Sequence, residues 1–131
     1  MEVEAAKRFC DAWLPAWTGN QPDRLIEFYA DDAFYSDPAR PAGLRGRADL
    51  LAYFRKLLAR NPDWVWRLKE AISTESGFVA KWVARVPVDK ETREVEGVDI
   101  VEIIGGKIAR NEVFFDRSLL SGAARLGNVK Y

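Results

Sequence analysis

Residues Leu25–Pro38 read LIEFYADDAFYSDP, and the stretch passes from helical to extended spacing within a few residues. Its first half belongs to a short helix that the apolar spacing predicts over 22–30. Its second half, Ala33–Asp37, is predicted as a brief strand. Residues 38–46 hold two prolines and two glycines, so we expect a loop there. The stretch therefore predicts a domain that combines helices and strands.

Upstream, apolar residues at helical spacing predict a helix over residues 3–18. Pro15 lies inside this pattern and is expected to kink or end the helix nearby. Downstream, the same spacing predicts a third helix over 47–60, which Asn61-Pro62 stops. The first half of the chain is thus predicted to be mainly helical.

Beyond residue 62 the hydrophobic pattern alternates, which is typical of strands. It predicts strands over 64–74, 78–88, 95–104 and 107–116, with a tight hairpin turn at Gly105-Gly106 and a short helical tail over about 117–126. In the first of these strands the alternation places Trp64, Trp66, Leu68 and Ile72 on one face. Helices followed by an antiparallel meander predict one α+β domain over residues 1–131, with helices packed on one face of a curved sheet.

The composition excludes several classes of partner. The 131 residues are 48% hydrophobic, and the net charge is zero, so a nucleic-acid partner is not expected. No apolar run approaches the ~20 residues that a membrane span needs, and the first residues lack the apolar segment of a secretory signal. Cys10 is the only cysteine and cannot form an internal disulfide. We expect a cytoplasmic protein that contacts neither membranes nor nucleic acid.

The absence of histidine limits the chemistry that the chain can perform. It excludes Ser-His-Asp and Cys-His catalysis and histidine-based metal sites. No residues show metal-ligand spacing, and no glycine-rich phosphate-binding motif is present. We expect neither a metal nor a cofactor, so acid–base chemistry must come from Asp, Glu, Tyr or Lys.

Three stretches resemble the NTF2-like superfamily, in particular its SnoaL-like and ketosteroid-isomerase-like branches. They are residues 25–38, residues Gly46–Phe54, and Gly106–Arg110 together with Phe115-Asp116. The resemblance implies a cone, in which a curved antiparallel sheet wraps around about three helices. It also implies a homodimer, and either cofactor-independent chemistry on a small molecule or non-catalytic binding, because the fold serves many functions.

The resemblance also suggests which residues form the site. Asp37 falls where the steroid isomerases keep their general base. Asp99 falls close to their protonated aspartic acid, which donates to the developing enolate oxygen. Trp13 falls where they keep an oxyanion tyrosine; an indole N–H can donate, but Trp13 has no phenol, so the resemblance does not imply steroid isomerisation itself.

The two aspartates each allow more than one interpretation. Strand alternation makes Asp99 the single acid on a row with Val95, Gly97, Val101 and Ile103, so burial should raise its pKa. Alternatively, Asp99 pairs with an arginine or tyrosine, or lies at a pocket rim. Asp37 is either a catalytic base or a turn residue that ends its strand before Pro38.

The aromatic residues suggest what the pocket would bind. Trp13, Tyr35, Trp64 and Trp82 are candidate contacts for an apolar or aromatic small molecule, although ordinary core packing explains such residues equally well. The sequence leaves two functions open. One is proton transfer at a carbon acid, as in an isomerase or polyketide cyclase; the other is a non-catalytic binding or interaction module.

Overall fold

The computed structural model describes residues 1–120, which form helices and one six-stranded sheet. The helical elements are α1 (Val3–Trp13), the 3₁₀ helix η1 (Leu14–Trp17), α2 (Pro22–Ile26), α3 (Arg47–Arg60) and the 3₁₀ helix η2 (Arg117–Leu120). The strands are β1 (Tyr29–Asp37), β2 (Arg40–Arg45), β3 (Val65–Ser73), β4 (Gly77–Val88), β5 (Glu91–Ile104) and β6 (Lys107–Phe115).

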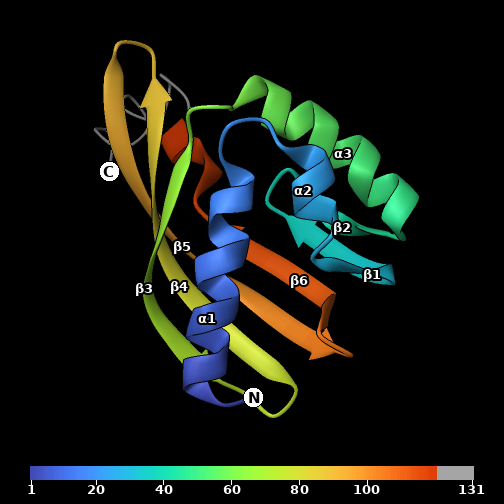
Figure 1. Cartoon of the computed structure of the whole chain (residues 1–131). Helices are drawn as coiled ribbons and strands as arrows, with labels where there is room; N and C mark the ends of the chain where they lie inside the picture. Colours follow the sequence, from blue (N-terminus) through green and yellow to red (C-terminus); the bar gives the residue numbers. More distant parts are fainter. Residues whose placement is uncertain (121–131) are drawn as a thin grey trace.

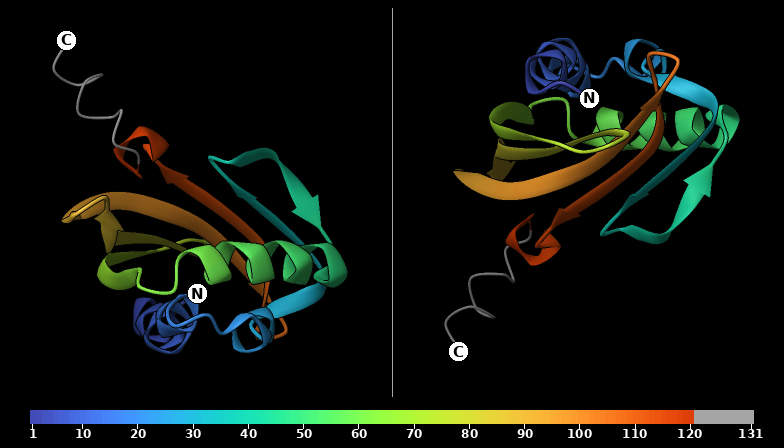
Figure 2. Two further views of the ribbon diagram at one scale, coloured as in Figure 1. Left: turned by 90° about the horizontal axis from the view of Figure 1, so that it is seen from above. Right: turned by 90° about the horizontal axis from the view of Figure 1, so that it is seen from below.

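The strands follow the order β2-β1-β6-β5-β4-β3 across the sheet. Neighbouring strands are antiparallel, except that β1 runs parallel to β6. The sheet is strongly bent, and α1 and α3 lie on the same side of it (Figures 1 and 2). This is the α+β cone that the sequence predicted, and it leaves room for a cavity between the helices and the bent sheet.

The helix boundaries follow from local sequence signals. The first helix ends at Trp13, just before Pro15, and the chain tightens into a 3₁₀ turn. The third helix spans the predicted residues and buries Leu50, Phe54 and Leu58, which stand four residues apart on one face. These buried faces form the helical side of the core.

One predicted loop is instead a strand. Residues 40–45 form β2 and pair antiparallel with β1, so the prediction of a loop over 38–46 was wrong there. Pro41 is compatible with this strand because β2 lies at the sheet edge. The strand predicted from Ala33 also begins earlier, at Tyr29, because α2 ends at Ile26.

A bulge in β3 corrects the predicted face of Ile72. The pairing of β3 with β4 shifts register between Leu68 and Glu70. Each residue after this bulge therefore points to the face opposite to the one that strict alternation predicts. Ala71 therefore points inward and is buried, whereas Ile72 is 48% exposed. Strict alternation cannot anticipate an inserted residue.

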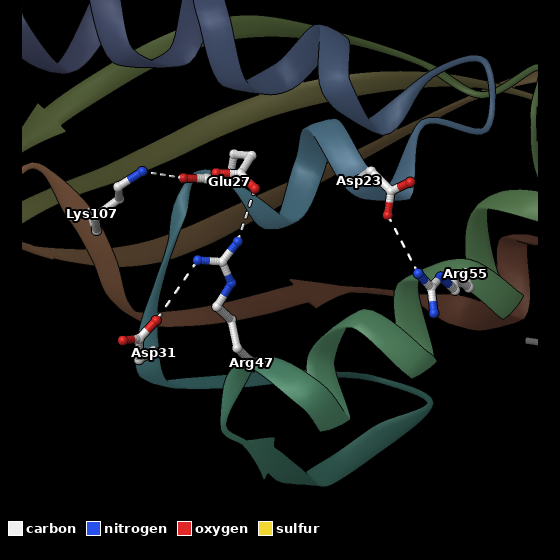
Figure 3. Close-up of polar contacts among 6 residues, drawn as sticks. All are labelled: Asp23, Glu27, Asp31, Arg47, Arg55 and Lys107. Carbon is white, nitrogen blue, oxygen red and sulfur yellow. Dashed lines mark hydrogen bonds and ion pairs between the residues drawn. The ribbon is translucent and has the colours of Figure 1, made fainter.

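Exposed ion pairs join α2, α3 and the start of β1 at the surface. Arg47 pairs with Glu27 at 3.0 Å and with Asp31 at 3.7 Å, and Lys107 donates to the backbone oxygen of Glu27 (Figure 3). Exposed pairs of this kind contribute little to stability, about 0–1 kcal/mol each. The buried polar groups therefore matter more for function.

Candidate functional site

A cavity of about 120 Å³ opens between the helices and the bent sheet. Its walls come from η1, β1, α3, η2 and strands β3 to β6, and they are mainly apolar and aromatic. The predicted site residues Asp37, Asp99, Tyr35, Trp64 and Trp82 all line this cavity. The bend of the sheet has thus brought together residues from distant parts of the sequence.

The structure places Trp13 elsewhere. Its side chain is fully buried and packs against Phe9, Trp17 and Phe78, and it does not contribute to the cavity lining. Trp17, one helical turn further on, lines the cavity. Trp13 is therefore part of the core behind the cavity wall.

Seven aromatic rings form a continuous wall in the cavity. Trp66 is central: its ring centroid lies 4.7 Å from that of Trp82, 5.9 Å from Trp64 and 6.2 Å from Trp17. The wall continues from Trp17 to Tyr35 and Tyr53, and from Trp82 to Phe115, with centroid separations of 5.8–6.2 Å. All of these contacts are edge-on or tilted, the arrangements that aromatic pairs prefer over face-to-face stacking.

Asp37 is a carboxylate with all its acceptor sites filled. Its Oδ1 accepts the backbone N–H groups of Ala39 and Arg40, each at 2.9 Å. Its Oδ2 accepts the phenol groups of Tyr35 and Tyr53, each at 2.7 Å. A carboxylate offers about four lone-pair sites, so these four donors occupy them.

The two phenols remain protonated donors to Asp37. Burial, followed by the nearby charge of Asp37, raises the pKa of Tyr35 well above its ordinary value. Burial and the hydrogen bond to Asp37 likewise raise the pKa of Tyr53. The β1 strand supplies Tyr35 and Asp37, and α3 supplies Tyr53, so this cluster ties the helix to the strand end.

Asp99 is buried but has fewer partners. Its side chain is 4% exposed. The Trp82 indole donates to Oδ1 at 2.8 Å, and the Asn111 amide donates to Oδ2 at 2.9 Å. The phenol of Tyr29 donates to the oxygen of the same Asn111 amide at 2.7 Å, which fixes the amide's orientation. Within residues 1–120, two of the four acceptor sites of Asp99 are thus without a donor.

Burial raises the pKa of Asp99 from 3.8 to about 6. The hydrogen bonds from Asn111 and Trp82 act in the opposite direction, and the charge of Asp37 adds to the rise. The upward shift has the direction and the cause that the strand pattern predicted. At neutral pH, however, a carboxyl with this pKa is mostly ionised, so the neutral donor form is the minor one.

Several site residues were not found from the sequence. The sequence pattern places Trp66 on the same strand face as Trp64 without marking it as a site residue, and it singles out neither Tyr53 nor Asn111. Strand alternation could have revealed Asn111, because it lies two residues before Val113 and therefore on the same inward face of β6. It is fully buried there, and a buried amide needs hydrogen-bond partners. Trp66 adds a further polar group, because its buried Nε1 has no hydrogen-bond partner among residues 1–120.

The positive charges lie at the edge of the site. Arg117 is an exposed member of the cavity lining, and the Arg40 guanidinium lies 5.9 Å from the Tyr53 ring centroid. Within residues 1–120, no three His, Cys, Asp or Glu side chains gather as a metal site would require. In the same part of the chain, no helix is both long and apolar enough to cross a membrane.

Comparison with known proteins identifies similar sequences and folds. A family model described as SnoaL-like domain matches residues 7–111. A protein with a ketosteroid-isomerase-like fold from Catenulispora acidiphila, solved in complex with trimethylamine, is 21% identical, with a TM-score of 0.73 over 82% of this chain and 85% of that chain. None of the curated proteins matches the chain.

Two further solved structures show the same fold. A SnoaL-like protein of unknown function from Burkholderia thailandensis is 20% identical, with a TM-score of 0.71 over 88% of this chain and 98% of that one. The protein RV0760c from Mycobacterium tuberculosis is 15% identical, with a TM-score of 0.73 over 88% and 94% of the two chains. Identities this low establish the shared fold alone.

Proposed function

This chain belongs to the SnoaL-like domain family, and on that premise we propose that it transfers a proton at a carbon acid, without a cofactor, on an apolar or aromatic small molecule held in the cavity. The observation that supports this most directly is Asp99. It is a buried carboxylate in an aromatic cavity, with a raised pKa and two acceptor sites that no donor of the described residues fills. Isomerisation and intramolecular cyclisation both begin with such a step.

The hydrogen bonds favour Asp99, in place of Asp37, as the base. A general base works best when its pKa lies near the operating pH, and a pKa of about 6 meets that condition. A base also needs a free lone pair directed at the substrate. All four acceptor sites of Asp37 are filled, so its proposed role is to hold Tyr35 and Tyr53 in place.

In the proposed step, Asp99 removes a proton from the carbon next to a carbonyl group. The electron pair of the broken C–H bond forms the enolate, and the protonated Asp99 returns its proton to the same or another carbon. The unpartnered Nε1 of Trp66 is the proposed donor to the ligand oxygen, because a ligand acceptor would satisfy it.

The test is exchange of the α-proton of aromatic enones and diketones in heavy water, followed by NMR. A positioned base contributes roughly 10²–10⁴-fold to rate, so Asp99→Asn should slow exchange by about that factor. Asp32→Asn removes an exposed carboxylate and should leave the rate unchanged. Loss of exchange in Asp37→Asn, with exchange retained in Asp99→Asn, would reverse the assignment.

The second candidate function is a non-catalytic binding module of the same fold. It is favoured by the filled acceptor sites of Asp37, which leave this carboxylate no free lone pair. Ligand binding without proton exchange by the unmodified protein would support it. In either case, we propose that the protein works in the cytoplasm as a homodimer.

A further inference from the structure

The cavity holds two carboxylates, and within residues 1–120 neither of them forms an ion pair with a basic side chain. Asp37 and Asp99 are 7% and 4% exposed, and their hydrogen-bond donors are phenol, indole, amide and backbone groups, all of them uncharged. Among the described lining residues, the basic one is Arg117, which lies exposed at the edge, and the Arg40 guanidinium lies 5.9 Å from the Tyr53 ring centroid, also at the edge. The interior of the cavity is therefore electronegative.

The aromatic wall adds to this negative potential. Ring faces carry partial negative charge, and tryptophan provides the strongest attraction for cations. Three rings of the wall, those of Tyr35, Tyr53 and Trp82, donate their polar hydrogen to a carboxylate. Donation to an anion shifts electron density into the ring, so these faces should attract a cation more strongly than isolated rings would.

We propose that the ligand of this cavity carries a tertiary or quaternary amine cation, held against the aromatic wall and balanced by Asp37 and Asp99. The carboxylates supply the opposite charge, and the rings replace part of the ligand's hydration. This inference specifies the substrate class of the proposed function and rests on the same cavity being the ligand site.

A cationic substrate also suits the proposed chemistry. Deprotonation of a neutral ketone by Asp99 would form an enolate anion in the same cavity as the charge of Asp37. Deprotonation of a carbon acid that bears an ammonium group forms a zwitterion with no net charge. The C–H electron pair still moves into the enolate and the proton still passes to Asp99, but the substrate's own cation stabilises the developing negative charge.

An anionic ligand is the main alternative, because Arg117 could pair with it at the edge of the cavity. Three probes of similar shape separate the possibilities. The cationic probe is choline. The neutral probe is 3,3-dimethylbutan-1-ol, in which a tert-butyl group replaces choline's trimethylammonium head. The anionic probe is the carboxylate of the same skeleton, 3,3-dimethylbutanoate (tert-butylacetate). Binding can be followed by the fluorescence of the tryptophans in the wall.

We expect choline to bind at least about tenfold more tightly than the alcohol, since a desolvated cation–π contact alone provides that preference. Asp99→Asn should reduce this preference about tenfold, whereas Asp32→Asn, an equal charge change at an exposed position, should not alter it. Trp64→Leu offers a second test at a partly exposed position of the wall and should also reduce the preference.

Equal binding of choline and the alcohol, tighter binding of tert-butylacetate, or no binding of any probe would each overturn the inference. Its failure can be distinguished from failure of the proposed function. Proton exchange on neutral ketones without a preference for choline would leave the proton-transfer function standing. A preference for choline without any proton exchange would instead support a cation-binding module.

Discussion

Trp82 and Asp99 are joined by an indole-to-carboxylate hydrogen bond of 2.8 Å, although they are not direct partners across β4 and β5. In the ladder, Trp82 faces Gly97 and Asp99 faces Ala80, so the bond runs diagonally along the sheet. Gly97 permits this arrangement: a Cβ there would lie 2.5 Å from Cη2 and Cζ2 of the Trp82 ring. The Trp82 ring thus occupies the space that the side chain of any residue other than glycine would need at position 97.

The first prediction follows from this contact. Gly97→Ala should push the Trp82 ring aside, weaken its bond to Asp99, and destabilise the protein by about 1–3 kcal/mol, as overpacking does. The added Cβ would also lie 2.6 Å from the Phe114 backbone oxygen, which cannot move as freely as a side chain. Urea denaturation measures the loss; unchanged stability would show that the ring is not held as described.

The second prediction concerns stability and pH. The pKa of Asp99 in the folded chain, about 6, lies above the ordinary value of 3.8, so folding favours its protonated form. The stabilising contribution of Asp99 to the free energy of unfolding is fully present below its ordinary pKa of 3.8. It is lost as the pH rises through the pKa of the folded chain, about 6. A shift of this size corresponds to on the order of 3 kcal/mol.

The stability difference between the parent protein and Asp99→Asn isolates this effect, because asparagine does not titrate. We expect the parent to lose stability relative to the variant as the pH rises through this window, and the difference to be constant above it. The neighbouring groups Cys10 and Tyr29 do not interfere, since burial raises the pKa of Cys10 to about 12 and that of Tyr29 well above 10. Asp37 is common to both proteins. A stability difference between the two proteins that does not change with pH would contradict the burial of Asp99.

The third prediction compares the two phenols that donate to Asp37. Tyr35→Phe should cost about 1.5–3 kcal/mol, because the Asp37 carboxylate loses the hydrogen bond of a phenol whose residue is only 2% exposed. Tyr53→Phe should cost less, since Tyr53 is only half-buried and water can take the place of its hydroxyl. Thermal unfolding of both variants tests the order; the reverse order would argue against it.

The fourth prediction concerns the pH dependence of proton exchange. If Asp99 is the base, the exchange rate should rise with pH and level off above about 6, where the carboxylate form predominates. Asp37, Cys10 and Tyr29 are the other titratable groups that act on Asp99 in this site. A rate that falls with rising pH over this range would show that the protonated carboxyl is the active form.

The fifth prediction concerns assembly through the outer face of the sheet. Ile72, Val79 and Ile100 lie in one row across β3, β4 and β5, and Phe114 lies beside Val98 in the next row. Ile72 and Phe114 are 48% and 49% exposed, which is an unusual amount of apolar surface for a monomer. Light scattering should therefore give twice the 14.9 kDa mass of one chain.

A charge on this face should separate the dimer. Ile72→Lys is expected to give the mass of one chain, whereas Val3→Lys, at an exposed position of α1, should leave the dimer intact. A parent protein that scatters as a single chain would contradict the prediction directly.

The sequence was most informative where one local rule acted alone. The apolar spacing of 47–60 defined α3 correctly, and the alternation around Asp99 placed it on the inner face with Val95 and Val101. The family resemblance then supplied the cone, in which a curved antiparallel sheet wraps around the helices, and no local pattern contains that arrangement. These signals together predicted the fold and five cavity residues.

The remaining features depend on contacts between distant segments. β2 was missed because Pro41 and Gly43 indicate a loop, whereas pairing with β1 holds them in a strand. The filled acceptor sites of Asp37 depend on Tyr53, which comes from another element sixteen residues away. A sequence shows that a carboxylate is present, but its donors determine whether it can act as a base.

The parallel pairing of β1 with β6 also has a consequence for how the chain folds. The hydrogen bond from Tyr29 to Asn111 spans 82 residues, and the sheet can be completed only after that long loop has closed. Contacts between such distant residues slow folding, because chain entropy is lost before the contacts form. During synthesis, the edge of β1 that pairs with β6 stays unpaired until β6 has left the ribosome. The N-terminal strands are therefore the part of the newly made protein that is most exposed to misassembly.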